Sequence, residues 1–294
     1  MTQDTLAHTF AEQAWADRIA QPLQQPVYTL LERLPALRTF LNGTWMGHPV
    51  HAAVTDVPVG AWAAGAVFDL LDSLGVRRDL RQASDAVQTV GLAAALGAAV
   101  FGLADWSYTG DKARRIGLIH GLTNVGIAGL YGLSLLARRR GQRAVGTTLS
   151  GVGFGLLLFS GWLGGELSYR YGVGVNRRAF EEEPGEWTDV LDEREVREGQ
   201  LYRADAAGTP VLVTRFQGQF YAIGDTCTHM GCSLSEGRLE GDAVACPCHD
   251  SHFRVTDGQV VRGPATVSEP AYAVRVRDGR IEVRRVDAAQ PAAA

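Results

Sequence analysis

The sequence lacks several features that would assign it to common functional classes. It has no basic patch with interleaved aromatic residues, and its formal net charge is −4, which together exclude the usual kind of nucleic-acid-binding surface. Residues 1–45 contain no short apolar core followed by a small-residue cleavage site, so we expect no cleavable signal peptide. Charged residues make up 20% of the chain, yet they are missing from three long internal stretches. The middle of the chain therefore differs in composition from the C-terminal third.

The uncharged stretches have the length of membrane spans, since they run for 18, 22 and 22 residues at 87–104, 116–137 and 144–165. A weaker fourth stretch, 54–71, is interrupted by two aspartates and a proline, but three spans alone would leave its apolar surface without a burial partner. Glycine is abundant in these stretches, as expected where helices pack closely in lipid. The sequence thus predicts a four-helix transmembrane domain over 46–171, in contact with membrane lipid, with a soluble helical bundle as the alternative.

Apolar residues recur at helical spacing between Val27 and Leu41, while Arg33 and Arg38 fall elsewhere on the same helix. This pattern suits an amphipathic helix that lies on the membrane surface within an N-terminal tail, 1–45. Pro35 would kink or shorten such a helix. Packing of the helix against the C-terminal domain is the alternative.

Four spans place both ends of the membrane domain on one side, where several ionisable residues gather. These are His48, His51, Asp56, Asp105, His120 and Glu166. Ionisable groups in or near hydrocarbon are functional candidates by default. His51 or His48, together with His120, could bind a haem b or line a quinone pocket. The competing interpretation is that these groups hydrogen-bond between helices and to interfacial water.

Two short boxes near the C-terminus contain all four cysteines. The first reads Cys-Thr-His-Met-Gly-Cys from Cys227, and the second, after 13 intervening residues, reads Cys-Pro-Cys-His from Cys246. One cysteine and one histidine from each box would supply two thiolates and two imidazoles, the ligand set of a Rieske [2Fe-2S] centre. Zinc also accepts two cysteines and two histidines and is the alternative, although structural zinc motifs favour a cysteine pair followed by a histidine pair.

These boxes, C-T-H-x-G-C and C-P-C-H, resemble those of a Rieske iron–sulfur domain of the disulfide-bearing type found in quinol-oxidising complexes. The resemblance implies a Rieske domain over residues 186–287, in which 263–265 form a loop that covers the cluster. It implies that the cluster ligands are Cys227, His229, Cys246 and His249. It also implies a disulfide between Cys232 and Cys248.

Residues beside the second box bear on the reduction potential. Ser251 is placed to donate a hydrogen bond to the cluster, which would raise the potential. High-potential members of the family carry tyrosine where this chain has Phe253 and glycine where it has Asp250, and both differences are expected to lower the potential. His252 is expected to be an exposed loop histidine rather than a further ligand.

Runs of β-branched and aromatic residues joined by turn signals, such as 210–216 and 219–223 around Gln217-Gly218, predict a small antiparallel sandwich. The fold class is therefore multidomain, with an N-terminal four-helix transmembrane bundle and a C-terminal all-β Rieske sandwich. Residues 172–185 form the linker, which is either a semi-flexible tether or a fixed spacer. Residues 288–294 are expected to be a disordered tail.

The leading functional interpretation is a membrane-anchored Rieske protein that transfers single electrons between a membrane donor, quinol or haem, and another carrier such as a cytochrome. The alternatives are an electron-transfer component of an oxidoreductase or oxygenase system, and a redox sensor. The sequence has no evident facial triad for a mononuclear iron, so the chain is not itself a Rieske oxygenase. The sequence does not decide whether the chain is an enzyme, because it fits both an electron-transfer protein and an oxidoreductase subunit.

The sequence determines orientation in the membrane poorly. Lysine and arginine near the two faces number seven each, so the positive-inside rule gives a tie. The disulfide that the resemblance implies favours an oxidising compartment. We therefore expect a multi-pass protein of the bacterial cytoplasmic membrane whose Rieske domain is on the extracytoplasmic side.

Overall fold

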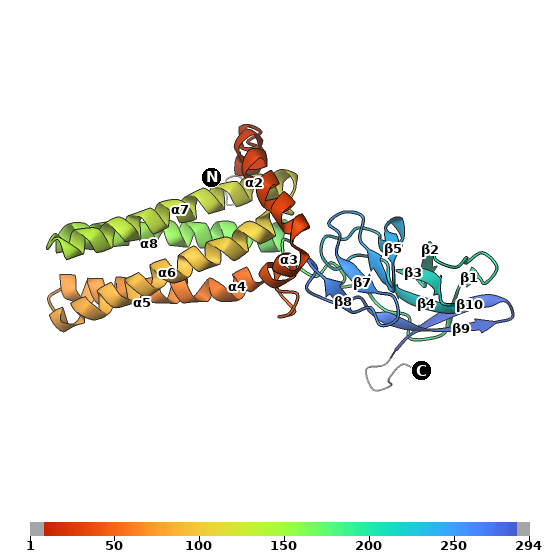
Figure 1. Cartoon of the computed structure of the whole chain (residues 1–294). Helices are drawn as coiled ribbons and strands as arrows, with labels where there is room; N and C mark the ends of the chain where they lie inside the picture. Colours follow the sequence, from red (N-terminus) through yellow and green to blue (C-terminus); the bar gives the residue numbers. More distant parts are fainter. Residues whose placement is uncertain (1–8, 287–294) are drawn as a thin grey trace. The chain divides into compact units, whose positions relative to one another are not determined.

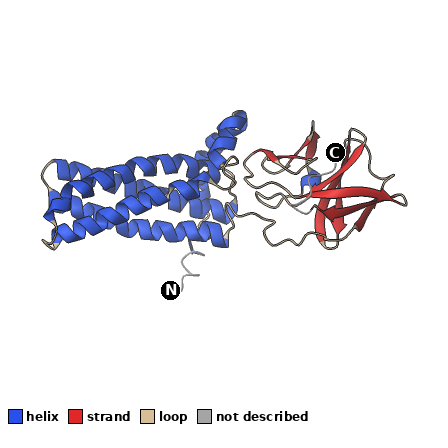
Figure 2. Ribbon diagram, turned by 90° about the horizontal axis from the view of Figure 1, so that it is seen from below, coloured by secondary structure: helices blue, strands red, loops and turns tan. Residues whose placement is uncertain are grey.

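The computed structural model describes residues 9–286, which form two compact units (Figures 1 and 2). The first unit combines the described residues up to Arg33 with Pro49–Val173, and the second combines Leu34–His48 with the described residues from Gly174 onward. The tail expected at 288–294 lies outside the described residues.

The first unit is a bundle of long antiparallel helices (Figure 1). Its helices are α2 (Trp15–Arg33), α4 (Val50–Val54), α5 (Asp56–Ser73), α6 (Arg81–Trp106), α7 (Asp111–Arg139) and α8 (Arg143–Gly165). Four helical segments are long and apolar enough to cross a membrane, namely Val50–Ser73, Arg78–Trp106, Asp111–Arg139 and Arg143–Arg170. The predicted number of spans is therefore confirmed. The helices extend beyond the uncharged stretches because polar residues at their ends continue the same hydrogen-bonded turns.

Close packing inside the bundle depends on small residues, as the abundance of glycine suggested. The rings of Trp62 and Tyr131 stack with centroids 4.1 Å apart. A Cβ atom at Gly91 would lie 2.5 Å from Trp62 Nε1, so only glycine leaves space for this indole. Large side chains such as Val67, Leu96 and Leu158 are exposed instead, which is the surface that lipid tails solvate in a membrane domain.

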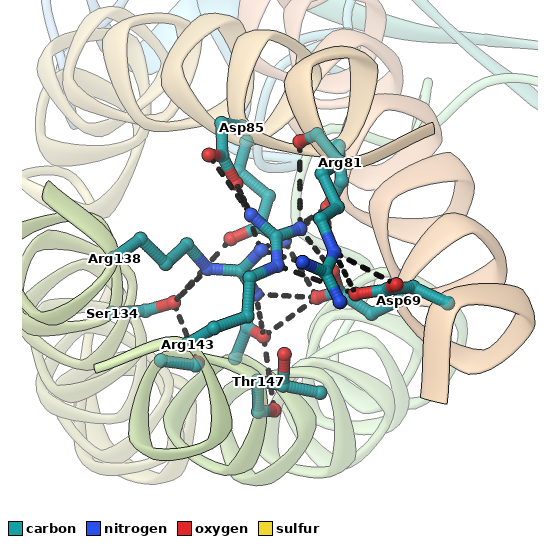
Figure 3. Close-up of polar contacts among 12 residues, drawn as sticks. Asp69, Arg81, Asp85, Ser134, Arg138, Arg143 and Thr147 are labelled. Carbon is teal, nitrogen blue, oxygen red and sulfur yellow. Dashed lines mark hydrogen bonds and ion pairs between the residues drawn. The ribbon is translucent and has the colours of Figure 1, made fainter. Parts of the chain in front are cut away.

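A network of opposite charges, buried at Asp69 and Arg138, joins α5, α6, α7 and α8 (Figure 3). The Arg138 guanidinium donates to both carboxylate oxygens of Asp69 and to Asp85 Oδ1, the latter at 2.9 Å. Arg143 also pairs with Asp85, at 2.8 Å, and Arg81 with Asp72, also at 2.8 Å. The hydroxyls of Ser84, Ser134 and Ser150 complete the network. Three arginines therefore balance three aspartates, and Asp69, which seemed to weaken the first span, is the centre of this network.

The second unit contains two antiparallel sheets, which confirms the predicted β fold of the C-terminal domain (Figure 2). The larger sheet has the order β1-β10-β9-β4-β3-β2 and the smaller has the order β5-β6-β7-β8. The strands are β1 (Thr188–Asp192), β2 (Leu201–Ala206), β3 (Thr209–Phe216), β4 (Gln219–Gly224), β5 (Arg238–Glu240), β6 (Ala243–Ala245), β7 (His252–Arg254), β8 (Val260–Arg262), β9 (Ala271–Arg277) and β10 (Arg280–Arg285). The expected hairpin joins β3 to β4, and Gln217 and Gly218 both have positive φ, as a tight hairpin turn requires.

Two segments outside the strands also belong to the second unit. The single helix expected near 27–41 is divided at Leu34, because Pro35 begins the separate helix α3 (Pro35–Asn42), which contacts β8. In the linker, Arg178 is buried and pairs with Glu181 at 2.8 Å, and the Arg285 N–H donates to Pro184 O at 2.8 Å. Both contacts lie within the second unit, and the Pro184 contact joins this end of the linker to β10.

We predict that Arg138→Met lowers the free energy of unfolding by about 3–5 kcal/mol, because it leaves the buried Asp69 carboxylate without its main counter-charge. Thermal unfolding in detergent, followed by helical circular dichroism, measures this loss. Exposed Arg139 offers the matched control, and Arg139→Met should change stability by less than about 0.5 kcal/mol. Adding Asp69→Asn to Arg138→Met should recover part of the loss. Equal unfolding temperatures for the Arg138 and Arg139 variants would contradict this prediction.

Candidate metal centre

The two cysteine boxes fold into equivalent turns. The Gly231 N–H donates to Cys227 O at 2.8 Å, and the Asp250 N–H donates to Cys246 O at 3.0 Å. The residue that closes each turn has positive φ, +81° at Gly231 and +57° at Asp250. Glycine adopts this region freely, and aspartate tolerates it better than most side chains. The backbone therefore explains why glycine would be preferred at the position that Asp250 occupies here.

A disulfide joins the two turns, as the sequence resemblance implied. Cys232 and Cys248 are bonded, with their Cα atoms 6.5 Å apart. Each turn is also closed from within, since the Cys227 N–H donates to Cys232 O and the Cys246 N–H donates to Ser251 O, both at 2.8 Å. These restraints fix the side chains that face each other across the turns.

The potential ligands form a thiol pair and an imidazole pair. Cys227 and Cys246 are free thiols that are 1% and 2% exposed, and the rings of His229 and His249 lie with their centroids 5.1 Å apart. A hydrogen bond from the Cys227 thiol lowers the pKa of Cys246 to about 7, and the same contact, together with burial, raises the pKa of Cys227. The Cys246 thiol therefore loses its proton more readily than an ordinary cysteine.

Both imidazoles are neutral at physiological pH. Burial lowers the pKa of His229 to about 3, helped by His249, Arg177 and Arg38, and burial also lowers the pKa of His249. The Nδ1 atom of each ring is buried and makes no hydrogen bond, although both residues have other contacts. Neutral imidazole nitrogens and paired thiols are the donors that a [2Fe-2S] cluster with mixed ligands requires, so these residues fit that group.

Comparison with known proteins gives each part of the chain a family match. Residues 186–277 match the Rieske [2Fe-2S] domain family, and residues 47–177 match a family described as a predicted membrane protein, DUF2231. The ferredoxin CarAc of Metapseudomonas resinovorans is 39% identical over 98 residues, which are 33% of this chain and 92% of that protein. This chain belongs to the Rieske family. Its Rieske domain implies a [2Fe-2S] cluster and single-electron transfer, and it is joined to a membrane domain.

Two further matches cover the same part of the chain. The 3-phenylpropionate/cinnamic acid dioxygenase ferredoxin subunit of Escherichia coli O139:H28 is 42% identical over 89 residues, which are 30% of this chain and 82% of that protein. A solved complex of reduced oxygenase and oxidized ferredoxin in carbazole 1,9a-dioxygenase contains a chain with 37% identity and a TM-score of 0.33, covering 34% of this chain and 95% of that chain.

The loops around the Rieske site are held by buried hydrogen bonds. The Thr228 N–H donates to Glu269 Oε1 at 2.8 Å, and the Thr228 hydroxyl donates to Val267 O at 2.7 Å. Burial raises the pKa of Glu269 to about 8, although Arg178 opposes this shift. Ser251 is fully buried, and its Oγ accepts from the Ala265 N–H at 3.0 Å, which leaves the hydroxyl proton for another acceptor. The loop at 263–265 is therefore bonded directly to Ser251, two residues after the second box.

Two residues of the Rieske domain differ from their sequence-based interpretation. His252 is 7% exposed rather than an exposed loop residue, because β7 begins there and pairs with β6, and its Nε2 lies 3.3 Å from Asp250 Oδ1. The Asp250 carboxylate is not an isolated negative charge, since Arg38, Arg238 and Arg262 all pair with it. The sequence predicted neither the pairing of Asp250 nor the contact with Arg38.

Two of the three membrane histidines come together in the first unit. The ring nitrogen Nδ1 of His51 lies 2.9 Å from Ala98 O, and that of His120 lies 3.0 Å from Ser160 O. Because carbonyls only accept, each Nδ1 carries the proton and each Nε2 presents a lone pair. The ring centroids are 6.5 Å apart, and Asn124 Nδ2 lies 3.1 Å from His120 Nε2. His48 is exposed and belongs to the second unit.

We predict that Ser251→Ala lowers the reduction potential of the cluster by about 40 mV, because a lost hydrogen bond worth about 1 kcal/mol more in the reduced state has this effect for one electron. Protein-film voltammetry measures the shift. Ser268 lies on the surface of the Rieske domain, and Ser268→Ala should leave the potential unchanged. A Ser251→Ala potential equal to that of the wild type would refute the role of this hydroxyl.

Proposed function

We propose that this chain is a membrane-anchored Rieske electron carrier in which Cys227 and Cys246 bind one iron and His229 and His249 bind the other. When bound, the cluster supplies reversible one-electron chemistry. The observation that carries this proposal is the thiol pair and the imidazole pair in two disulfide-linked turns. The chain would pass single electrons between a donor in the membrane and another redox protein.

The side chains at this site have different proposed roles. The two cysteines are buried, whereas His229 and His249 are more exposed, so a partner protein is expected to approach the imidazole side. Thr228 fixes the first box through Glu269 and Val267, and Ser251, two residues after the second box, accepts from Ala265 of the 263–265 loop. The Ser251 hydroxyl would then be left to donate toward the bound cluster. The rigid surroundings would limit reorganisation when the charge of the cluster changes.

An oxygenase is a second candidate for the partner, besides a cytochrome. The relatives that match the Rieske domain are named as ferredoxin components of dioxygenase systems, which favours the alternative of an electron-transfer component for an oxygenase. Cross-linking of the full-length protein in native membranes, followed by mass spectrometry, separates the two. A cytochrome among the cross-linked proteins supports the membrane-chain role, and a terminal oxygenase supports the oxygenase role.

The membrane donor is proposed to be quinol or haem, bound near His51 and His120. Main-chain carbonyls hold both Nδ1–H groups, the arrangement that commonly orients a metal-binding or hydrogen-bonding imidazole. A pyridine haemochrome spectrum of the purified protein tests whether the protein binds haem. If no haem is found and His120→Ala retains electron transfer from quinol, these histidines only join helices.

We also propose that the Rieske domain lies on the extracytoplasmic side of the bacterial cytoplasmic membrane. The disulfide between Cys232 and Cys248 supports this, because disulfides persist in oxidising compartments. Labelling of a tagged C-terminus in intact cells with an impermeant reagent tests the side. Labelling only after the membrane is opened would contradict it.

We predict that His249→Ala abolishes the cluster, because one iron loses a ligand, and that His252→Ala retains it. The two histidines lie three positions apart in the same box and its following strand, so the pair controls for local disturbance. Iron and acid-labile sulfide, each assayed per mole of full-length protein, measure the outcome. Equal iron content in both variants, or zinc in the wild-type protein, would exclude the proposed ligand set.

A further inference from the structure

A fully buried arginine beside the second box comes from a distant part of the chain. Arg38 lies on α3, and its side chain is 0% exposed. Its Nη2 donates to Asp250 O at 3.0 Å and lies 3.6 Å from Asp250 Oδ2. These residues are 212 positions apart, and Asp250 directly follows the proposed ligand His249. Arg38 lies outside the residues that match the Rieske family.

The segment that carries Arg38 is fastened to the loop that flanks the site. The Gly263 N–H donates to Thr39 Oγ1 at 3.2 Å, and the Thr44 hydroxyl donates to Ala265 O at 2.9 Å. A Cβ atom at Gly263 would lie 2.6 Å from Thr44 Oγ1, so glycine permits this close approach. Two threonines therefore hold α3 and the residues after it against the covering loop, which positions the arginine beside the second box.

The charges around Asp250 do not cancel. The Asp250 carboxylate meets the guanidinium groups of Arg38, Arg238 and Arg262, and Arg238 also pairs with Glu240 at 2.5 Å. Three positive charges therefore face two negative charges, which leaves one positive charge in excess. The Arg238 side chain is 57% exposed, so water screens it, whereas the Arg38 side chain is buried completely. A buried charge interacts with its surroundings more strongly than an exposed one, because the local dielectric constant is lower. Arg38 is therefore the arginine with the strongest expected effect on the site.

We propose that Arg38 is a redox-tuning residue, whose buried positive charge stabilises the reduced cluster and raises its potential. The inference rests on the proposed ligand set. Reduction adds one electron, no bond forms or breaks in the protein, and the negative charge of the site increases by one. A fixed cation favours the more negative state. Arg38 would thus offset the lowering of the potential expected from Asp250.

The test is a mediator titration of full-length wild-type protein and variants, followed by the EPR signal of the reduced cluster. At the wild-type midpoint potential, Arg38→Gln should lower the ratio of reduced to oxidised protein about tenfold, which corresponds to about 59 mV for one electron. Arg38→Lys keeps the charge and should stay within about threefold of the wild type. Arg238→Gln is the matched control at an exposed partner of Asp250, and it should also stay within about threefold.

Two results would overturn this role. One is an Arg38→Gln ratio within about threefold of the wild type, and the other is an Arg38→Lys ratio that falls as far as that of Arg38→Gln, because packing rather than charge would then be the cause. If Arg38→Gln loses its iron, its potential cannot be measured, and the Asp250→Asn variant then tests the proposal. This variant keeps all three arginines and should raise the reduced fraction, and an unchanged fraction refutes the proposal. Wild-type protein without iron and sulfide would overturn the proposed function, and this inference with it, before any potential is measured.

Discussion

The architecture of the Rieske unit depends on holding two cysteine boxes in one fixed relation. The disulfide between Cys232 and Cys248 joins the boxes covalently, and the same i to i+4 hydrogen bond closes each turn. This arrangement places two thiols together and two imidazoles together while removing most of their surface from water. Burial keeps the imidazoles neutral, because it disfavours their charged form. The geometry and the protonation of the four proposed ligands thus both depend on how the two boxes are held together.

The features that the sequence predicted correctly are those that depend on residues close together in the chain. Ligand chemistry requires particular residue types at close spacing, so the boxes predicted two thiols and two imidazoles that the structure brings together in pairs. The apolar stretches of membrane length predicted the four candidate spans. The contacts that were missed join distant residues. Arg38 and Asp250 are 212 positions apart, and Arg138 and Asp69 are 69 positions apart. No local spacing encodes such pairs. His252 was misjudged because its burial depends on where β7 pairs with β6.

Buried arginine–aspartate contacts recur in both units, and they have different consequences. In the membrane domain, three arginines balance three aspartates across four helices, so these helices are joined by a network that carries no net charge of its own. At Asp250 of the Rieske unit, three arginines face Asp250 and Glu240, which leaves one positive charge in excess beside the second box. The first arrangement is a structural restraint, and the second is the basis of the proposed effect of Arg38 on the reduction potential.

The central claim is that two thiolates and two imidazoles hold a diiron cluster in a membrane-bound electron carrier. EPR spectroscopy of the dithionite-reduced, full-length protein in its native membrane tests this most directly, because histidine ligation of one iron lowers the average g value below that of an all-cysteine [2Fe-2S] cluster. We expect this lowered average g value. A spectrum with the average g value of all-cysteine ligation, or no iron–sulfur signal from folded protein, would contradict the claim.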